Sequence, residues 1–348
     1  METNNYFKNL TQCFIIAEIG VNHNGDIMLA KEMIDAAQES GADAVKFQTF
    51  SAETLASEET PKVKYQENTT SKSETHFEML KKLELSKDSH YELINYSNEL
   101  NLRFLSTPYD IESAKFLSEI GVDMYKTSSA DLVDLPLQKF LAFTGKPVIV
   151  ATGMATLGEI EPITQIFDAA ENKNLILLHC VSNYPCSDAS INLRAMNTLE
   201  SAFQVPVGFS DHSEGSLAAS LSVAFGAKVI EKHFTLDKSL AGPDHRASST
   251  PEEFCELVRK VRQSEAILGS PIKSCQKEER QMASVSRKSI VLSKDCAKGT
   301  TLKADDLTLR RPGTGISSHH LDSFVGSFLQ HNLTAGSLLK WSDIKEKE

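Results

Sequence analysis

The sequence predicts an α/β protein in which a TIM (β/α)8 barrel is followed by a small β-rich domain. Short apolar runs alternate eight times with amphipathic helical stretches between Phe14 and Gly269. Eight such units in about 255 residues match the strand number and size of a TIM barrel. After Gly269 the alternation stops, and short strand-like pieces broken by Gly and Pro begin. A doubly wound open sheet is the main alternative, because one sequence does not show whether a sheet closes.

The predicted strands are β-rich apolar runs, and the predicted helices are amphipathic stretches that mostly end at a glycine, as helix C-caps do. The strands cover residues 14–19, 44–49, 103–106, 123–127, 147–151, 175–181, 205–209 and 229–234. The clearest helices cover residues 28–40, 111–120, 160–171, 217–225 and 251–268.

The chain divides into a barrel domain at 1–269, a polar linker at 270–283 and a second domain at 284–348. In the second domain, residues 299–307 (GTTLKADDL) resemble residues 336–344 (GSLLKWSDI), which indicates a small pseudo-symmetric β domain. Residues 51–87 are polar and too long for an ordinary βα loop. We expect them to be irregular and to cover the barrel mouth after the second strand.

The composition is that of a soluble globular protein. The 36 Lys and Arg against 47 Asp and Glu give a formal charge of −11, which argues against nucleic acid as the main partner. No run approaches 18 uninterrupted apolar residues, and the first 12 residues are polar. We therefore expect no membrane span, no secretory signal and a cytoplasmic location. The six scattered cysteines are typical of reduced thiols.

Polar side chains stand at the C-terminal ends of the predicted strands, where a TIM barrel carries its functional groups. Because alternate residues of a strand share a face, Lys46 lies with Gln48, and Glu231 with His233. A charge facing the helix layer would be costly to bury, which favours the barrel interior for Lys46 and Glu231. A network that only fills the barrel is the alternative. The other polar residues at these ends include Glu18, Thr107, Lys126, Ser129, Ser182, Tyr184, Ser210 and His212.

Two kinds of site are predicted from these residues. His212 and His233 end adjacent strands and could share a divalent metal, with Glu18 and Glu231 nearby. Two imidazoles completed by water suit a labile Mn²⁺ best, with Mg²⁺ or Co²⁺ as alternatives, rather than a closed structural Zn²⁺. An anion cradle for phosphate or carboxylate is formed by two lysines and three hydroxyls, and a Schiff-base aldolase would use the same lysines. These residues are Lys46, Lys126, Thr107, Ser129 and Ser210.

The chain resembles the sialic acid (N-acetylneuraminate) synthases and their bacterial relatives that make legionaminic and pseudaminic acids. The resemblance is carried by short motifs in register with all eight predicted strands and by one motif in the C-terminal domain. They are AEIGVNHNG at 17–25, VKFQT at 45–49, STP at 106–108, YK at 125–126, ATGM at 151–154, HC at 179–180, YP at 184–185, GFSDH at 208–212, EKHFT at 231–235, GPD at 242–244 and RPG at 311–313.

This resemblance implies a TIM barrel followed by an antifreeze-like (SAF) domain, in a domain-swapped homodimer. It also implies that phosphoenolpyruvate condenses with an N-acetylmannosamine-type sugar to give a nine-carbon 2-keto acid and phosphate. His212 and His233 would hold the metal. The phosphoenolpyruvate would bind to Lys46, Lys126, Ser129 and Ser210. The sugar would face Glu18, Gln48, Tyr184, Asp244 and the partner subunit's Arg311.

Glu231, beside the metal ligands, is our candidate general base for the water that adds to the enolpyruvate carbon, and Glu18 is the next candidate. Ala151, the pair Thr127-Ser128 and Ser182 depart from the common pattern of the family: Ser182, which we still expect to bind substrate, stands where other members have Asn. These differences affect single hydrogen bonds, not the reaction.

The identity of the sugar is open at this level. N-acetylmannosamine, giving N-acetylneuraminate, is the first hypothesis, and 2,4-diacetamido-2,4,6-trideoxymannose, giving N,N'-diacetyllegionaminate, is nearly as well supported. The segment with Lys64, Tyr65, Gln66 and Asn68 resembles the legionaminate type. Other classes remain as alternatives: a Schiff-base aldolase, which borohydride and pyruvate would trap, and a non-catalytic carbohydrate- or ice-binding protein, which would not need paired charges at the strand ends.

Overall fold

The computed structural model describes residues 5–57, 60–62, 70 and 74–345, and it divides into two compact units, Met1–Gly269 and Ser270–Glu348. The segment with Lys64, Tyr65, Gln66 and Asn68 lies outside the described residues. No helix in the described ranges is both long and apolar enough to cross a membrane. All six cysteines are free thiols.

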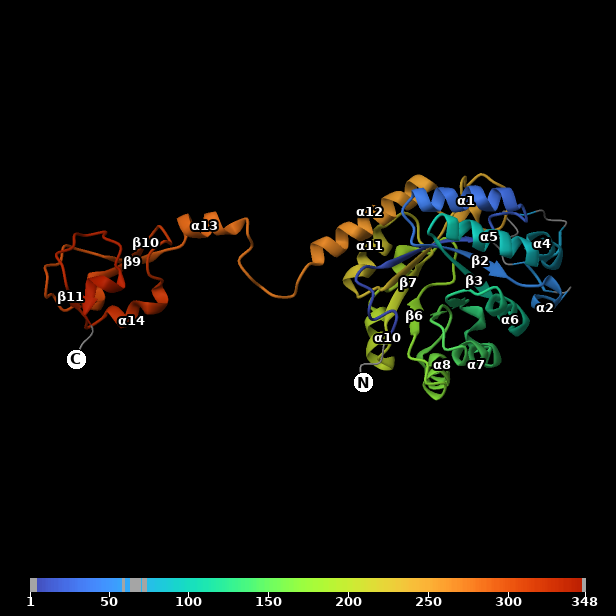
Figure 1. Cartoon of the computed structure of the whole chain (residues 1–348), viewed down its shortest axis with the longest axis horizontal. Coiled ribbons are helices and arrows are strands. Elements are labelled where there is room, and N and C mark those ends of the chain that lie inside the picture. The colour runs from blue at the N-terminus through green and yellow to red at the C-terminus, as the bar shows by residue number, and fades with distance from the viewer. Residues whose placement is uncertain (1–4, 58–59, 63–69, 71–73, 346–348) are drawn as a thin grey trace. The chain divides into compact units, whose positions relative to one another are not determined.

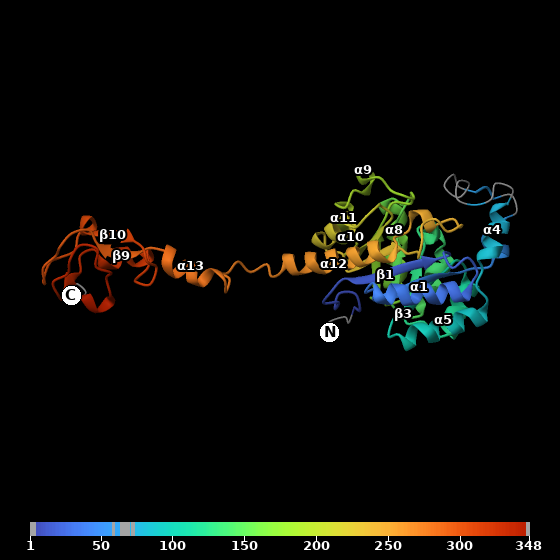
Figure 2. The same ribbon diagram turned by 90° about the horizontal axis from the view of Figure 1, so that it is seen from above.

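The first unit is a closed barrel of eight parallel strands surrounded by helices (Figures 1 and 2). The hydrogen-bonded order is β3-β2-β1-β8-β7-β6-β5-β4, and β3 packs against β4 to complete the circle. The pairing of β1 with β8, together with the packing of β3 against β4, leaves neither end of the sheet open and so excludes the doubly wound alternative, which would have two open edges. The strands are β1 (Phe14–Gly20), β2 (Ala44–Thr49), β3 (Arg103–Pro108), β4 (Tyr125–Thr127), β5 (Val148–Ala151), β6 (Leu175–His179), β7 (Val207–Asp211) and β8 (Val229–His233).

The barrel interior is apolar at its base and polar at its top. A buried cluster fills the base, and Phe7, from the segment before β1, joins it there. Alternate residues of a strand point into the barrel. In β1 these are Phe14, Ile16 and then Glu18, and in β8 they are Val229, Glu231 and His233. The top layer at the carboxyl ends is therefore the polar one.

The helices carry clear capping signals and end near their predicted limits. In α12 (Pro251–Leu268), the Thr250 hydroxyl and the Glu253 side chain form a capping box, and the helix has the predicted bounds. Strand β7 begins two residues later than predicted and extends to Asp211, and β6 ends two residues earlier, at His179. The remaining helices of this unit are α1 (Ile27–Glu39), α2 (Ala52–Leu55), α4 (His76–Leu83), α5 (Lys87–Glu99), α6 (Ile111–Glu119), α7 (Leu135–Phe143), α8 (Leu157–Ala169), α9 (Asp188–Ile191), α10 (Ala195–Phe203) and α11 (Leu217–Ala224), with 3₁₀ turns η1 (Ala130–Val133) and η2 (His245–Ala247).

The described part of segment 51–87 is not simply irregular, as the sequence had suggested, because it contains α2 and α4. Helix α4 starts at a capping box in which Thr75 and Glu78 exchange hydrogen bonds between side chain and backbone. Its buried face packs with Val21 and Phe50 in a small core of its own. The segment thus adds an apolar wall beside the barrel mouth.

The second unit is a small β domain with its own core. Each copy of the predicted internal repeat ends in a 3₁₀ turn that leads into the second strand of an antiparallel pair, β9 with β10 or β11 with β12. In each copy a backbone N–H donates to an aspartate three residues on: Lys303 to Asp306 (2.9 Å) and Lys340 to Asp343 (2.8 Å). The elements are α13 (Glu279–Ser286), β9 (Ser289–Leu292), η3 (Ala304–Asp306), β10 (Leu307–Arg310), η4 (Ser318–His320), α14 (Leu321–Phe324), β11 (Phe328–Leu329), η5 (Trp341–Asp343) and β12 (Ile344–Lys345).

Candidate active site

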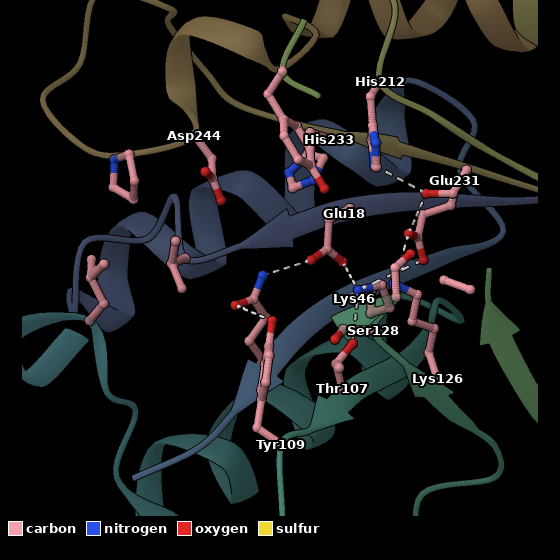
Figure 3. A pocket seen from close by; sticks show the side chains of 18 of the residues that line it. Glu18, Lys46, Thr107, Tyr109, Lys126, Ser128, His212, Glu231, His233 and Asp244 are labelled. Atoms are coloured by element: carbon pink, nitrogen blue, oxygen red, sulfur yellow. Dashed lines mark hydrogen bonds and ion pairs between the residues drawn. The ribbon is translucent and has the colours of Figure 1, made fainter. Parts of the chain in front are cut away.

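A cavity of about 300 Å³ opens at the carboxyl ends of the barrel strands (Figure 3). This volume is at the lower end of the range for small-molecule sites. Of the fourteen residues predicted from the sequence, twelve line the cavity: Glu18, Lys46, Gln48, Thr107, Lys126, Ser129, Tyr184, Ser210, His212, Glu231, His233 and Asp244. The other two, Ser182 and Arg311, do not.

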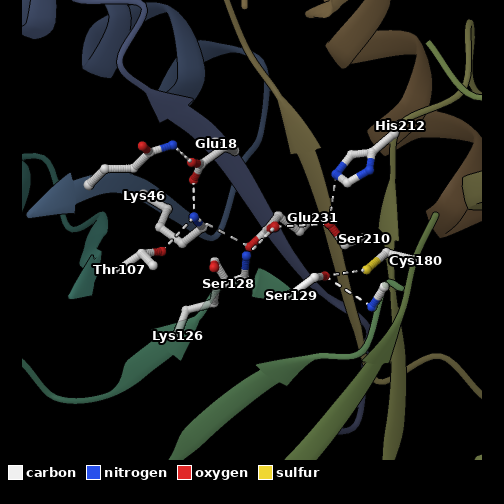
Figure 4. A network of polar contacts seen from close by, with 12 residues as sticks. Glu18, Lys46, Thr107, Lys126, Ser128, Ser129, Cys180, Ser210, His212 and Glu231 are labelled. Carbon is white, nitrogen blue, oxygen red and sulfur yellow. Dashed lines mark hydrogen bonds and ion pairs between the residues drawn. The ribbon is translucent and has the colours of Figure 1, made fainter. Parts of the chain in front are cut away.

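The Lys46 ammonium stands between two carboxylates on the cavity floor (Figure 4). Its Nζ contacts Glu18 Oε2 directly, donates to Thr107 Oγ1 at 3.0 Å and lies 3.7 Å from Glu231 Oε2. All three charged side chains are almost fully buried. Gln48 continues the chain outward, since its Nε2 donates to Glu18 Oε1 (3.2 Å) and its Oε1 accepts from the Tyr109 hydroxyl (3.1 Å).

A second lysine shares Glu231 from the other side. Lys126 Nζ lies 3.3 Å from Glu231 Oε1, which also accepts a hydrogen bond from the Ser210 hydroxyl at 2.9 Å. Glu231 Oε2 is buried and has no hydrogen-bond partner among the described residues. The two lysines and the two glutamates leave the floor nearly neutral, with one carboxylate oxygen available.

The two glutamates differ in their proton affinity. Burial opposes the charged form of Glu231, but the ammonium groups of Lys126 and Lys46 and the Ser210 hydroxyl outweigh it and lower its pKa to about 2. For Glu18, burial outweighs the nearby Lys46, so its pKa is raised. Burial likewise lowers the pKa of Lys46, while the carboxylates of Glu231 and Glu18 overcome burial and raise that of Lys126. Glu18 and Lys46 are thus the pair closer to exchanging a proton.

The two predicted metal ligands form an aromatic group with Tyr184. The ring centroids of His212 and His233 are 5.7 Å apart, and the Tyr184 ring lies 4.2 Å from the first and 5.6 Å from the second. Burial lowers the pKa of His212 to about 4, and burial together with His212 lowers that of His233 well below its usual value. Both rings are therefore neutral at pH 7, the form that binds metal ions.

The donor set fits an open metal site. His212 Nδ1 lies 2.8 Å from the Val181 carbonyl, a partner that fixes the proton on Nδ1 and leaves Nε2 on the Ser210 side as the ligand atom. His233 Nδ1 is buried and forms no hydrogen bond within the part of the chain that the structure describes. Among the described residues, no group of three or more His, Cys, Asp or Glu is arranged to hold a metal. Two imidazoles would leave the remaining positions to water or substrate, as in a labile catalytic site.

The two predicted residues that do not line the cavity have other surroundings. Ser182 lies just behind the lining, where a side chain at Gly153 would come within 2.5 Å of its hydroxyl. Beside it, the Ser129 hydroxyl accepts from the Gly153 N–H (2.9 Å) and contacts Cys180 Sγ (3.1 Å). Arg311 belongs to the second unit, where its Nε donates to the Ser286 carbonyl at 3.0 Å.

Asp244 stands on a loop that is tied to the loop after β1. His245 bonds Thr235 Oγ1 (2.7 Å), and the Asn22 side chain donates to the Phe234 carbonyl and to Ser248 Oγ (both 2.9 Å). Burial and the neighbouring Glu18 raise the pKa of Asp244 to about 7. The loop thus presents a carboxyl group that is easily protonated at the rim of the cavity.

Sequence reasoning placed residues 51–87 over the barrel mouth, which the cavity lining confirms, but it missed that they form an apolar wall of the cavity. Besides the polar groups, the lining includes an apolar wall formed by Val21, Leu55, Met79, Leu80 and Leu83, with His76 beside them. Most of these residues lie on α2 and α4, in the segment that was predicted to be irregular. The capping box Thr75-x-x-Glu78 before an apolar pattern was the available signal.

A buried ion pair on the outer face of β7 and β8 was also missed. Lys232 Nζ contacts Asp211 Oδ2 at 2.9 Å and the Ser213 carbonyl, and Asp211 Oδ1 accepts from the Ser213 backbone (2.9 Å) and hydroxyl (2.6 Å). This closed group fixes the turn that follows His212.

Fold and site together define a TIM-barrel protein with a buried lysine pair and a histidine pair at the carboxyl ends of its strands, followed by a small β domain. Family models match both parts: NeuB family over residues 33–273 and SAF domain over 287–345. The chain belongs to the NeuB family, with a C-terminal SAF domain. Its family, predicted from the motifs, and its barrel fold, predicted from the eight alternating units, are both confirmed.

Relatives with assigned activities cover nearly the whole chain. The N,N'-diacetyllegionaminic acid synthase of Legionella pneumophila is 48% identical over 337 residues, which are 96% of this chain and 95% of that protein. The enzyme of the same name from Campylobacter jejuni is 42% identical over 333 residues, 95% of this chain and 100% of that protein. The crystal structure of an N-acetylneuraminic acid synthetase from Leptospira borgpetersenii, in complex with citrate, is 37% identical, with a TM-score of 0.71 over 78% of this chain and 90% of that one.

Proposed function

We propose that this protein is a nonulosonic acid synthase that condenses phosphoenolpyruvate with an N-acetylated amino sugar and releases phosphate. The observation that carries the proposal is the buried Lys46 and Lys126 beside His212 and His233 at the carboxyl ends of the strands. The sequence put N-acetylmannosamine first. The identities of 48% and 42% to diacetyllegionaminic acid synthases favour 2,4-diacetamido-2,4,6-trideoxymannose, and thus N,N'-diacetyllegionaminate as product.

Charge explains why both lysines and a metal are needed. Phosphoenolpyruvate carries about three negative charges, and the cavity floor is nearly neutral because Glu18 and Glu231 already balance the lysines. His212 and His233 would hold a divalent ion, most suitably Mn²⁺, which would supply two positive charges and polarise the sugar aldehyde. The lysines, with Ser129 and Ser210, bind and orient the phosphate and carboxylate groups.

The protein's acids and bases then handle two protons. The enolpyruvate C3 forms a bond to the aldehyde carbon, whose oxygen gains a proton, and water adds to C2 and loses one. The C2–O bond to phosphate then breaks as the new C2 hydroxyl passes its remaining proton to the departing phosphate, which leaves the 2-keto acid and inorganic phosphate. Phosphoenolpyruvate draws the ammonium groups of Lys46 and Lys126 away from Glu231, so that the carboxylate regains basicity and accepts the proton from water. Glu18, whose pKa is raised, is suited to deliver the other proton.

The proposal includes a homodimer, located in the cytoplasm, in which the partner subunit's Arg311 completes each site. Residues 1–269 hold 23 Lys and Arg against 38 Asp and Glu, a formal charge of −15, whereas residues 270–348 hold 13 against 9, a charge of +4. Opposite charges on the two parts favour their association.

Mixing Arg311→Ala with Lys126→Ala chains should restore up to roughly one quarter of the sites, because half of the dimers are mixed and each has one intact site. No recovery after subunit exchange would contradict the shared site.

A substrate panel tests the reaction. The enzyme is supplied with phosphoenolpyruvate and Mn²⁺ and with N-acetylmannosamine, its 6-phosphate or the diacetamido sugar, and phosphate and keto acid are measured. We expect the highest kcat/KM with the diacetamido sugar. If no sugar leads to phosphate release, the reaction is wrong. Borohydride with pyruvate and no metal should leave the lysines unmodified, since a trapped imine would instead indicate an aldolase.

A further inference from the structure

The cavity combines two surfaces of different chemistry. Its floor is the network of Lys46, Lys126, Glu18 and Glu231, whereas one side is the apolar wall described above. Met79, Leu80 and Leu83 of that wall are each at most 9% exposed and pack with Val21 in one cluster. An apolar surface cannot stabilise a trianionic substrate, so binding of phosphoenolpyruvate at the floor does not explain why the wall is apolar.

The proposed reaction determines which end of the sugar meets this wall. The anionic groups of phosphoenolpyruvate belong on the lysines, and the aldehyde carbon must approach it beside His212 and His233. The rest of the sugar then extends from the floor toward the mouth. The chain Glu18–Gln48–Tyr109 runs in the same direction, and Tyr109 packs with Phe50 of the cluster around α4 (ring centroids 5.8 Å apart).

The wall contains one polar atom that lacks a partner. His76, the first residue of α4, lines the cavity, and its Nδ1 is buried without a hydrogen bond to any described residue. An imidazole nitrogen in this position can bond an amide group, and leaving it unpaired is costly. A ligand with a polar substituent next to an apolar one would bond the His76 nitrogen and also pack against the apolar side chains of the wall.

The structure assigns substrate selection to α4: Met79, Leu80 and Leu83 receive the C6 methyl group of a 6-deoxy sugar, and His76 bonds the acetamido group at C4. This inference rests on the proposed function. A hydroxymethyl group at C6 would bury a hydroxyl against side chains that cannot bond it. Apolar pockets reject an added hydroxyl by up to about 10²-fold, and polar groups that lose their partner can discriminate more strongly.

Three sugars separate the two contacts: 2,4-diacetamido-2,4,6-trideoxymannose, 2-acetamido-2,6-dideoxymannose and N-acetylmannosamine. Met79→Gln keeps the side-chain volume and adds an amide. It should lower kcat/KM for both 6-deoxy sugars relative to N-acetylmannosamine by roughly 10- to 100-fold. His76→Phe keeps a ring and removes the nitrogens. It should lower kcat/KM only for the sugar with the C4 acetamido group, by about 10-fold. KM for phosphoenolpyruvate should stay unchanged in both.

Phe77→Leu is the matched control, because Phe77 packs in the same cluster but does not line the cavity. It should leave the ratios between sugars unchanged. Equal shifts in Phe77→Leu and Met79→Gln would mean that a loosened α4 is responsible and would overturn the direct contact, as would unchanged ratios in Met79→Gln and His76→Phe. If Met79→Gln does not fold, Met79→Leu, an apolar change in shape, should alter the 6-deoxy ratio at least 3-fold, and an unchanged ratio overturns the assignment. A wild-type enzyme that prefers N-acetylmannosamine would instead contradict the proposed sugar, and one that releases phosphate with none of the three sugars would contradict the proposed reaction.

Discussion

Strands β7 and β8 send charged side chains to both faces of the barrel wall, and the two faces satisfy those charges differently. On the inner face, Glu231 Oε2 and His233 Nδ1 are buried next to a cavity and form no hydrogen bond to any residue that the structure describes. On the outer face, the neighbouring Lys232 contacts Asp211 and the Ser213 carbonyl, and both Asp211 oxygens are bonded.

This difference separates charged groups that bind a ligand from charged groups that stabilise the fold. Buried polar groups are normally paired, so a network that leaves atoms unpaired beside a cavity is prepared for a ligand. The outer pair has no such atom among the described residues and sits against the turn after His212. We infer that the outer pair stabilises the fold and does not bind substrate. Each prediction below perturbs one face and asks whether the other responds.

The largest effect should come from removing the metal from the inner face. Chelation should abolish turnover, and Mn²⁺ should restore it, because the two neutral imidazoles alone cannot compensate for the charge of phosphoenolpyruvate. The melting temperature should change by no more than a few degrees, since two ligands on an already closed barrel do not hold the fold. Assays of turnover and of melting temperature on the metal-stripped protein test both expectations. Full activity without metal would contradict the assignment of the histidine pair.

Glu231→Gln should give the next largest effect. The change preserves shape and removes the carboxylate, so we expect kcat to fall roughly 10²- to 10⁴-fold while phosphoenolpyruvate still binds. Glu18→Gln provides the comparison, since its pKa is raised whereas that of Glu231 is lowered to about 2. Steady-state kinetics on both variants identifies the base for water. A near-normal kcat in Glu231→Gln together with a large loss in Glu18→Gln would transfer that role to Glu18.

On the outer face, Lys232→Met should act on stability. The variant leaves the Asp211 carboxylate buried without a cation, which costs about 3–5 kcal/mol in free energy of unfolding. Asp211→Leu combined with Lys232→Met should recover only part of the loss, because an apolar pair has no charge to desolvate but leaves the Ser213 N–H and hydroxyl without their acceptor. Denaturant unfolding measures both. A loss below about 1 kcal/mol in the single variant would show that the outer pair is not what holds this turn.

The same comparison explains what the sequence could predict. The barrel and the cavity floor follow from alternation: once Lys46 and Glu231 are placed on the inward face of buried strands, the residues two positions further on share that face. Lys232 was not predicted, because its cost on the outer face is offset only by Asp211, a tertiary partner that no local pattern reveals. Helix α4 was overlooked because its short apolar pattern lies in a polar segment, although Thr75 and Glu78 marked its start. Ser182 was placed in the site because its strand ends there, but the cavity lining ends in front of it.

Asp244 adds a third arrangement, a partly buried carboxyl group with no described cation paired to it, and should give the smallest effect. Burial and Glu18 raise its pKa from 3.8 to about 7, so between pH 4 and pH 7 the folded state binds a proton that the unfolded state has released. Stability therefore falls as pH rises through this range and is level above it.

Asp244→Asn removes this dependence of stability on pH. The variant should match the wild type below pH 4 and exceed it by about 1 kcal/mol at pH 7 and above, a value kept low because the group is partly exposed. Unfolding at four pH values from 4 to 8 measures the difference, with Asp168→Asn as an exposed control. A difference that is constant with pH would mean that Asp244 is ionised throughout and paired with a cation in solution.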